Sequence, residues 1–305
     1  MKVLITGATG LVGQEIVNLC HQSGIEVNYL TTSKDKLSSK ANYTGYFWDP
    51  KRGEIDTDCF NDVEVIVNLV GATVAKRWTS SYRKEILESR THTASLILES
   101  LKNIKHSVRH IVSASAIGIY PDSFQNYYME DAPERDTGFL GEVVTQWENA
   151  VLQFKMLDIE VGLLRIGLVL SEKGGAFPKM VKPIRFGMGA FFGNGKQWQS
   201  WIHVQDLARI FMFVIEEELT GVFNAVAPNP VSNKKLMNTI AEKLNKKIVL
   251  PNVPRLTMKL FLGEMHSLLF SSQRVCSSRI STTGFNFNFD NIASAVDVLI
   301  DEESR

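Results

Sequence analysis

The chain has 305 residues, in which 33 lysines and arginines are balanced by 33 aspartates and glutamates. Because a protein that coats nucleic acid or an anionic membrane needs a basic surplus, this zero net charge argues against both kinds of partner. The length corresponds to one large domain or two fused ones. We therefore expect a small-molecule ligand that is held by local geometry.

The cysteines and the apolar runs indicate the compartment. The three cysteines, Cys20, Cys59 and Cys276, are far apart and show neither a disulfide framework nor metal-ligand spacing. No apolar run approaches the 18 or so residues of a membrane span, and the apolar stretch at the N-terminus is too short for a signal peptide. We expect a cytoplasmic protein without a metal site.

In chain order, short β-type runs alternate with stretches of helical periodicity over the first two-thirds of the chain. Strands are expected at 3–5, 27–30, 46–48, 65–70, 110–113 and 161–165. Helices with one apolar stripe are expected at 12–20, 86–101, 140–154 and 204–215. This alternation predicts an α/β fold, a Rossmann-type doubly wound parallel sheet.

The character of the chain changes after residue 165. Glycines and aromatic residues dominate 174–201, a composition that suits a pocket better than a regular layer, and Trp198 and Trp201 are either pocket walls or core residues. We expect a nucleotide-binding Rossmann domain at 1–165 plus about 200–228. The ranges 166–199 and 229–305 would form a smaller, C-terminal substrate-binding lobe.

A glycine fingerprint follows the first expected strand and opens the first expected helix. Glycine permits a tight turn and close backbone approach, and the N-terminus of a helix presents free N–H groups to a pyrophosphate. The alternative is a purely structural turn. The residues expected to contact a dinucleotide here are Gly7, Thr9, Gly10, Leu11, Val12 and Gly13.

The end of the second strand indicates which dinucleotide is bound. An NAD site would place a carboxylate there on the ribose 2′-OH, but the residues present are Thr31, Thr32, Ser33 and Lys34. These hydroxyls and the lysine suit the 2′-phosphate of NADP. NAD remains the alternative if Asp35 turns back toward the ribose.

Further segments resemble the extended short-chain dehydrogenase/reductases, the NAD-dependent epimerase/dehydratase proteins. The spacing GxxGxxG is one such feature, and the segments 68–72, 113–115 and 201–208 match in order. Segments 77–79, 89–90, 165–170, 193–198 and 200–203 narrow the likeness to the atypical, YfcH-like epimerase branch, whose members bind NAD(P). The resemblance implies further cofactor contacts at Asp49, Leu69, Gly71, Ala72, Arg90 and Ser113; Arg165 is either a ligand-phosphate contact or part of a structural ion pair.

One catalytic feature of the superfamily is missing. Most members use a Tyr-x-x-x-Lys pair for proton transfer, but no tyrosine of this chain has lysine four positions later. Aligned on Glu148, the two positions fall on Leu140 and Val144. Other candidates for the proton are Ser115, Tyr120, Glu142 and His203, for which the alternatives are packing for Tyr120, a surface carboxylate for Glu142 and a loop anchor for His203.

The sequence thus leaves two hypotheses of different classes. The first is an NADP(H)-binding, epimerase-like oxidoreductase that acts on a small carbonyl or sugar-nucleotide-like substrate. The second is a dinucleotide-binding sensor or regulator without catalysis, which the apolar residues at 140 and 144 favour. Either protein could be a monomer or a homodimer.

Overall fold

The computed structural model describes residues 1–303 and is organised around one nine-stranded sheet. The strand order is β13-β9-β7-β6-β1-β2-β4-β3, and β5 pairs with β4. Only β3 and β5 run antiparallel to their neighbour. The strands are β1 (Lys2–Thr6), β2 (Glu26–Thr31), β3 (Ser39–Lys40), β4 (Tyr43–Asp49), β5 (Glu54–Ile55), β6 (Val65–Asn68), β7 (His110–Ala116), β9 (Glu160–Ile166) and β13 (Gly221–Ala225).

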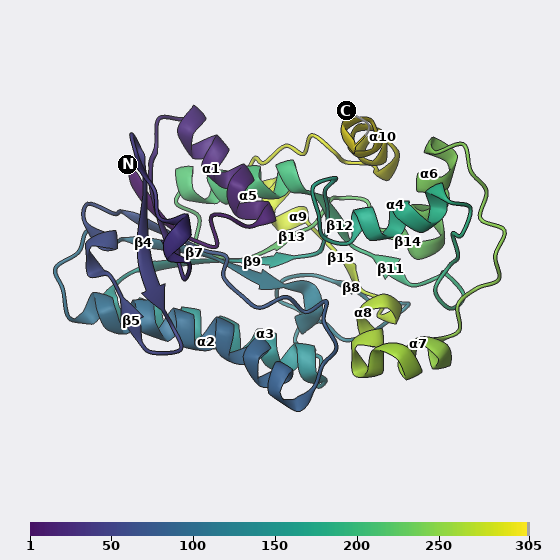
Figure 1. Ribbon diagram of the computed structural model, residues 1–305, viewed down its shortest axis with the longest axis horizontal. Coiled ribbons are helices and arrows are strands. Elements are labelled where there is room, and N and C mark those ends of the chain that lie inside the picture. The colour runs from purple at the N-terminus through teal and green to yellow at the C-terminus, as the bar shows by residue number, and fades with distance from the viewer. Residues whose placement is uncertain (304–305) are drawn as a thin grey trace.

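Helices cover both faces of this sheet, as Figure 1 shows. One face carries α1 (Leu11–Gln22) and α5 (Val204–Glu216), and the other carries α2 (Ser80–Lys102) and α3 (Phe139–Leu152). Parallel strands are apolar along their whole length, so they require cover on both sides. Each helix meets that requirement with its buried stripe, for example Ile16 and Cys20 of α1 or Leu207 and Phe211 of α5. The predicted α/β doubly wound fold is confirmed.

A second apolar core lies beyond the C-terminal edge of the sheet. It is built mainly from α4 (Phe177–Arg185), α6 (Asn233–Lys243) and α10 (Ile292–Glu303). The shorter helices are α7 (Arg255–Leu262), α8 (Ser267–Phe270) and α9 (Ser278–Thr282), with 3-10 turns η1 (Lys34–Lys36), η2 (Thr57–Phe60), η3 (Ile117–Ile119), η4 (Gln153–Leu157) and η5 (Gly263–His266). No helix within residues 1–303 has the length and apolarity to cross a bilayer.

Three two-stranded ladders lie outside the nine-stranded sheet. They pair β10 (Leu168–Leu170) with β12 (Trp201–His203), β11 (Trp198–Gln199) with β14 (Val231–Ser232), and β15 (Arg274–Val275) with β8 (Tyr127–Tyr128). The chain also returns late to the first core, where Ile280 and Phe285 pack against the helices and strands of the sheet. Those two residues belong to the range that sequence reasoning gave to the smaller lobe.

Candidate functional site

The glycine fingerprint lies where the strand order reverses, between β1 and β6. Gly7 has a φ of +75°, and the backbone N–H of Gly10 donates to its carbonyl at 2.9 Å. A Cβ on Gly13 would lie 2.2 Å from the Gly7 carbonyl oxygen, so this position has room only for glycine. Helix α1 starts at Leu11 without a side-chain cap, which leaves its first N–H groups for a ligand. The cradle fits a pyrophosphate, because it is the kind of crevice at which doubly wound sheets bind dinucleotides.

A buried hydrogen-bond chain joins the ends of three strands beside this turn. Thr6 Oγ1 donates to Asn68 Oδ1 at 2.9 Å, and Asn68 Nδ2 donates to Ser113 Oγ at 3.0 Å. The Thr6 hydroxyl also accepts from the backbone N–H of Leu69 at 3.0 Å. Ser113 is fully buried, and this chain of hydrogen bonds holds the strand ends together, with Thr6 fixing the start of the 69–72 segment.

The segment that includes Gly71 and Ala72 is held by α2. The backbone N–H of Ala72 donates to Ser89 Oγ at 2.8 Å, and Arg90 Nη2 donates to the Ala72 carbonyl at 3.2 Å. A Cβ on Gly71 would lie 2.8 Å from the Arg90 guanidinium carbon. The Arg90 guanidinium also lies over the Trp147 ring, and burial lowers its pKa to about 10.

The loop after β2 carries hydroxyl side chains and is followed by the lysines of η1. Thr31 is buried and its Oγ1 accepts from the backbone N–H of Ser33 at 3.2 Å, while Thr32 is exposed. Lys34 Nζ lies 5.2 Å from the centre of the Phe47 ring, and Asp35 is exposed on η1. Asp49, at the end of β4, accepts from the backbone N–H of Lys51 at 3.1 Å.

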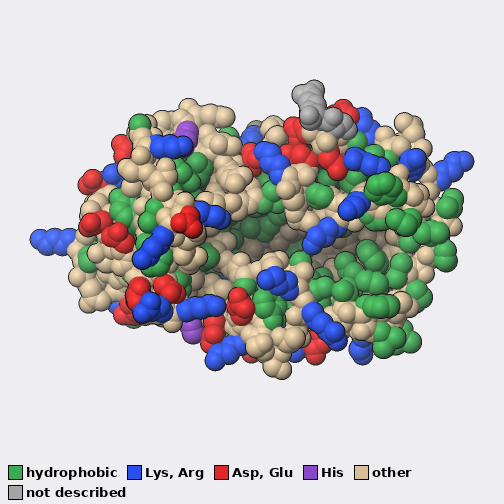
Figure 2. All heavy atoms as spheres, viewed as in Figure 1, with side chains coloured by type: hydrophobic (Ala, Val, Ile, Leu, Met, Phe, Trp, Pro, Cys, Tyr) green, Lys and Arg blue, Asp and Glu red, His purple; other side chains and the backbone are tan. Residues whose placement is uncertain are grey.

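A cavity of about 610 Å³ opens beside these strand ends, between the sheet layer and the second core (Figure 2). Its walls follow β6, β7 and β9 in the chain and continue through Trp198 and the 267–273 segment. At one end it reaches Gly175, whose Cβ would contact the Leu11 side chain at 3.6 Å. The cavity therefore adjoins the glycine fingerprint, and its size suits a small organic ligand.

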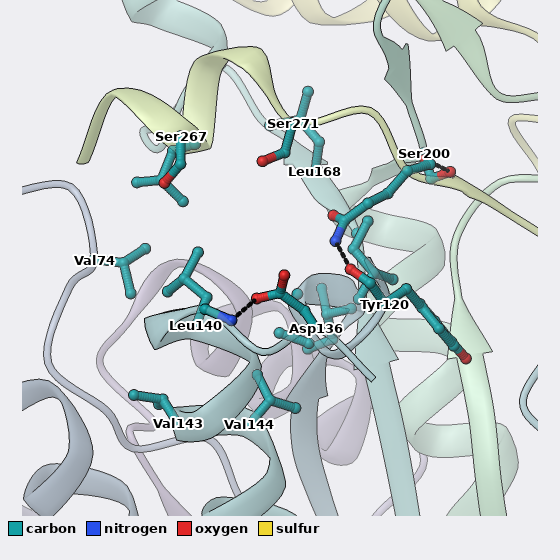
Figure 3. A pocket seen from close by; sticks show the side chains of 18 of the residues that line it. Val74, Tyr120, Asp136, Leu140, Val143, Val144, Leu168, Ser200, Ser267 and Ser271 are labelled. Atoms are coloured by element: carbon teal, nitrogen blue, oxygen red, sulfur yellow. Dashed lines mark hydrogen bonds between the residues drawn. The ribbon is translucent and has the colours of Figure 1, made fainter. Parts of the chain in front are cut away.

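The first turns of α3 present an apolar face to this cavity. Leu140, Val143 and Val144 line it, and Figure 3 shows their side chains on the cavity side of the helix. Leu140 and Val144 are the two positions at which the superfamily's tyrosine and lysine were expected. The structure therefore places both apolar residues in the wall where proton transfer would normally occur.

Ser115, Tyr120 and Arg165 lie together in a buried polar network. Arg165, 2% exposed, forms a two-pronged ion pair with Glu148 at 2.8 and 2.9 Å. Ser115 Oγ donates to the same carboxylate at 2.6 Å, and the Tyr120 hydroxyl accepts from Arg165 Nη1 at 2.9 Å. Burial alone would lower the pKa of Arg165, but its contacts with Glu148 raise it; burial raises the pKa of Tyr120.

These contacts fit the alternatives that the sequence left open for Arg165 and Tyr120, and they give Ser115 a partner inside the protein. The Tyr120 hydroxyl donates to Asn224 Oδ1 at 2.7 Å, so its proton is already engaged. The Arg165 guanidinium is taken up by Glu148 and is not free for a ligand phosphate. The Ser115 side chain is likewise committed to Glu148, and neither Ser115 nor Arg165 lines the cavity within the described residues. The network joins β7, α3 and β9 inside the protein, and its Tyr120 also lines the cavity.

Of Glu142 and the two tryptophans, the structure places one residue in the cavity wall. Glu142 is exposed on the outer face of α3, where its carboxylate accepts from Gln146 Nε2. Trp201 is fully buried in the second core, and its indole N–H donates to the Asn229 carbonyl at 3.0 Å. Trp198 alone of the two tryptophans lines the cavity, with its indole N–H on the Phe124 carbonyl at 3.2 Å.

His203 is an anchor at the start of α5. It is fully buried, its Nδ1 accepts from the backbone N–H of Gln205 at 3.2 Å, and its ring stacks on Phe289 at 3.9 Å. Burial lowers its pKa from 6.5 to about 4, against a smaller opposing effect of Asp206. His203 does not line the cavity in the described part of the chain. Its contacts are those expected of a histidine that anchors a loop.

The depressed pKa of His203 predicts an acid-sensitive fold. Because the folded-state pKa lies below the unfolded value, protons bind preferentially to the unfolded chain, and stability is lost as the pH falls from 6.5 toward 4. We expect a loss of about 3 kcal/mol across that window from this residue alone. In His203→Asn, which keeps a capping side chain, denaturant unfolding should show a flatter pH dependence; an unchanged slope would contradict the assignment.

Several polar residues of the cavity wall were not foreseen from the sequence. Asp136 Oδ2 accepts from the backbone N–H groups of Gly138 and Gly141 at 3.1 and 3.2 Å, and Figure 3 shows its carboxylate beside Leu140. An aspartate two residues before a glycine and an apolar helix is a helix-start signal that could have been noticed. Other such wall residues include Asp122, Gln199, Arg255, Ser267, Ser271 and Gln273.

The fold, the fingerprint at the reversal of strand order and the adjoining cavity define a dinucleotide-binding Rossmann protein. Residues 3–225 match the model of the NAD dependent epimerase/dehydratase family, and residues 253–299 match a domain of unknown function, DUF1731. The chain belongs to the NAD dependent epimerase/dehydratase family. The resemblance seen in the sequence is thereby confirmed.

Relatives and solved structures agree with this assignment. Epimerase family proteins of Staphylococcus epidermidis and Staphylococcus aureus are each 34% identical to the chain, covering 98% and 99% of it and 99% of those proteins. The human epimerase family protein SDR39U1, solved with NADPH, has a TM-score of 0.85 at 26% identity and 99% coverage of both chains. A nucleoside-diphosphate sugar epimerase from Corynebacterium glutamicum has a TM-score of 0.80 at 27% identity, covering 99% of this chain and 59% of that one.

Proposed function

We propose that the chain is an NADP(H)-dependent oxidoreductase of the epimerase-like type that acts on a small carbonyl compound. The observation that carries the proposal is that the 610 Å³ cavity reaches Gly175, beside Leu11 of the glycine cradle, which would bring a bound nicotinamide to a substrate. When bound, the dinucleotide supplies or accepts a hydride. The chain's own part is to hold the pyrophosphate on α1 and to shape the cavity.

NADP is favoured over NAD by the residues after β2. A 2′-phosphate needs a cation and hydroxyl donors, which Lys34, Thr32 and Ser33 offer without a competing carboxylate at the strand end. The structural neighbour solved with NADPH supports the same choice. Cytoplasmic location and the absence of nucleic acid and membrane partners remain predictions from composition, as does the choice between monomer and homodimer.

Reversing the charge at Lys34 tests the cofactor choice. In Lys34→Glu we expect the affinity for NADPH to fall about tenfold, with little change for NADH, because only NADPH carries the 2′-phosphate. Lys36→Glu is a matched control, since Lys36 is an exposed lysine of the same η1 turn. Thermal shifts with each dinucleotide provide the measurement. A wild-type chain that prefers NADH would overturn the NADP assignment.

A second candidate function is a dinucleotide-binding sensor without catalysis. It is favoured by Leu140 and Val144, because they remove the superfamily's proton-transfer pair from the cavity wall. The two functions differ in one result: tight NADPH binding without oxidation of NADPH by any aldehyde, ketone or quinone would favour the sensor.

A further inference from the structure

The cavity wall is mainly apolar and aromatic. Trp78 and Phe139 meet edge to face at 5.1 Å at one side, and Trp198 lies on another. Between them the wall is completed by Val74, Leu140, Val143, Val144, Leu168 and Leu268. A wall of this kind gains free energy by enclosing apolar, flat surface.

The charged groups of the wall are largely engaged within the protein. Arg90 donates to the carbonyl groups of Ile86 and Ala72 and lies over Trp147. Asp136 accepts from two backbone N–H groups, and Asp122 accepts from the backbone N–H of Ser272 at 2.8 Å. No lysine, glutamate or histidine among residues 1–303 lines the cavity. Arg255 donates to His266 Nε2 at 3.3 Å and is the one exposed cation of the wall within residues 1–303, so the diphosphate of a sugar nucleotide would meet a single accessible cation.

The wall also restricts the chemistry. Hydride addition to an ordinary ketone produces an alkoxide, a strong base that needs a proton donor held beside it. Tyr120 has its hydroxyl proton on Asn224, and Leu140 and Val144 have no proton to give. Hydride addition to a quinone instead produces a phenolate, whose conjugate acid has a pKa of about 10 as in tyrosine, so water suffices as the proton source. A quinone is therefore the carbonyl class that this wall can serve without an acid.

An apolar surface continues outward from the cavity. Figure 2 shows hydrophobic side chains gathered at one rim of the hollow, over α7 and α8. Helix α7 begins with the wall residue Arg255, contains no buried residue, and exposes Leu256, Leu260 and Phe261 to 70%, 75% and 73%. Exposed apolar patches of this kind mark binding surfaces. The patch provides a place for an apolar tail attached to a ring inside the cavity.

We infer that the cavity binds a quinone and that the chain reduces it with NADPH, an apolar tail of the quinone lying along α7. The inference rests on the proposed function and narrows its substrate. One hydride passes from NADPH to the quinone, and the resulting quinol monoanion takes one proton from water. NADPH, one quinone and one proton therefore give NADP⁺ and one quinol.

The test compares acceptors under nitrogen by following NADPH absorbance. We expect menadione to be reduced at least about 100-fold faster than cyclohexanone, the usual contribution of a missing general acid, and UDP-glucose to be inert as an epimerase substrate. Bound NADPH without menadione turnover, or turnover of UDP-glucose, would overturn the inference and leave the proposed cofactor site standing. A chain that binds no NADPH would overturn both.

Matched variants locate the ring in the cavity. Val144→Lys should lower kcat/KM for menadione at least about tenfold, because it buries a charge in the apolar wall, with the NADPH thermal shift retained. Asn149→Lys puts the same charge on the exposed face of α3 and should change nothing. Val144→Thr, close to valine in size, should lower kcat/KM in the same direction if Val144→Lys fails to fold. Unchanged menadione kinetics in the folded Val144 variants would contradict the placement.

Two further readouts test the proton source and the tail. The charged and titratable side chains of the wall are Arg90, Tyr120, Asp122, Asp136 and Arg255. Because water supplies the proton, kcat for menadione should be flat between about pH 6 and about pH 9. Phe261→Ser should raise KM for decylubiquinone and leave KM for menadione unchanged. A bell-shaped dependence of kcat on pH in that range would overturn water as the proton source. A KM for decylubiquinone that is the same in Phe261→Ser as in the wild-type chain would overturn the tail site.

Discussion

Gly10→Val is expected to abolish the thermal shift that NADPH produces. Gly10 has φ −81° and ψ 173°, a backbone conformation open to any residue, and a Cβ there would lie 3.2 Å from the Gly7 carbonyl oxygen. The fold should therefore persist with a small adjustment, while the valine methyls occupy the space that the pyrophosphate approaches. At a ligand concentration of about 100 Kd the wild-type chain should gain about 2.7 kcal/mol, and the variant nothing measurable.

Two other substitutions control this result. Ser23→Val alters the opposite end of α1 and should leave the NADPH shift intact. Gly13→Ala should destabilise the unliganded chain itself, because the new Cβ would lie 2.2 Å from the Gly7 oxygen and 2.8 Å from Ala8 Cα. NADPH binding by Gly10→Val at wild-type affinity would refute the fingerprint as the pyrophosphate site.

Arg165→Leu is expected to cost about 3–5 kcal/mol of unfolding free energy, because it leaves the buried Glu148 carboxylate without its cation. The substitution also removes donors to the Tyr120 hydroxyl and the Glu130 carbonyl. Denaturant unfolding followed by circular dichroism measures the loss. The double variant Arg165→Leu/Glu148→Leu should recover part of it, since no charge is then left buried.

An exposed ion pair provides the control for that experiment. Lys102 and Glu99 are 2.8 Å apart on the outer surface of α2, and Lys102→Ala should change stability by less than about 1 kcal/mol. If Arg165→Leu cost no more than Lys102→Ala, the network would not be the structural element described above.

The fold was predictable because its signals are local and repeated. The strands at 3–5 and 27–30 and the helix at 12–20 form the first βαβ unit, and their periodicity alone separates core from surface. The short ladders β8–β15 and β11–β14 were not predictable, because two-residue strands carry no periodicity and pair segments far apart in the chain. The packing of Ile280 and Phe285 in the first core is a tertiary contact of the same kind.

The candidate site was predictable only in part, for a physical reason. The glycine cradle depends on backbone geometry, which glycine spacing reports directly. Whether a residue can transfer a proton depends on which way its side chain points. Ser115 and Tyr120 follow or end a strand beside the cavity, but the hydroxyl of Ser115 donates to Glu148 and that of Tyr120 to Asn224. The cavity wall is formed by several segments between residues 74 and 273, and no local sequence pattern predicts which of them come together.

The late return of the chain to the sheet bears on how such proteins can be recombined. Ile280 and Phe285 fill space among the sheet's own helices, and Asn224 of β13 donates to the Cys276 carbonyl at 2.9 Å. A chimaera that exchanges residues 253–299 for those of a relative therefore replaces part of the nucleotide layer's core together with one rim of the cavity. Donor and acceptor chains must match at Phe213 and Arg209, which contact the Phe285 ring, if the hybrid is to fold. Changing the cavity by exchanging this segment therefore also requires that the core of the sheet domain, away from the cavity, be repacked.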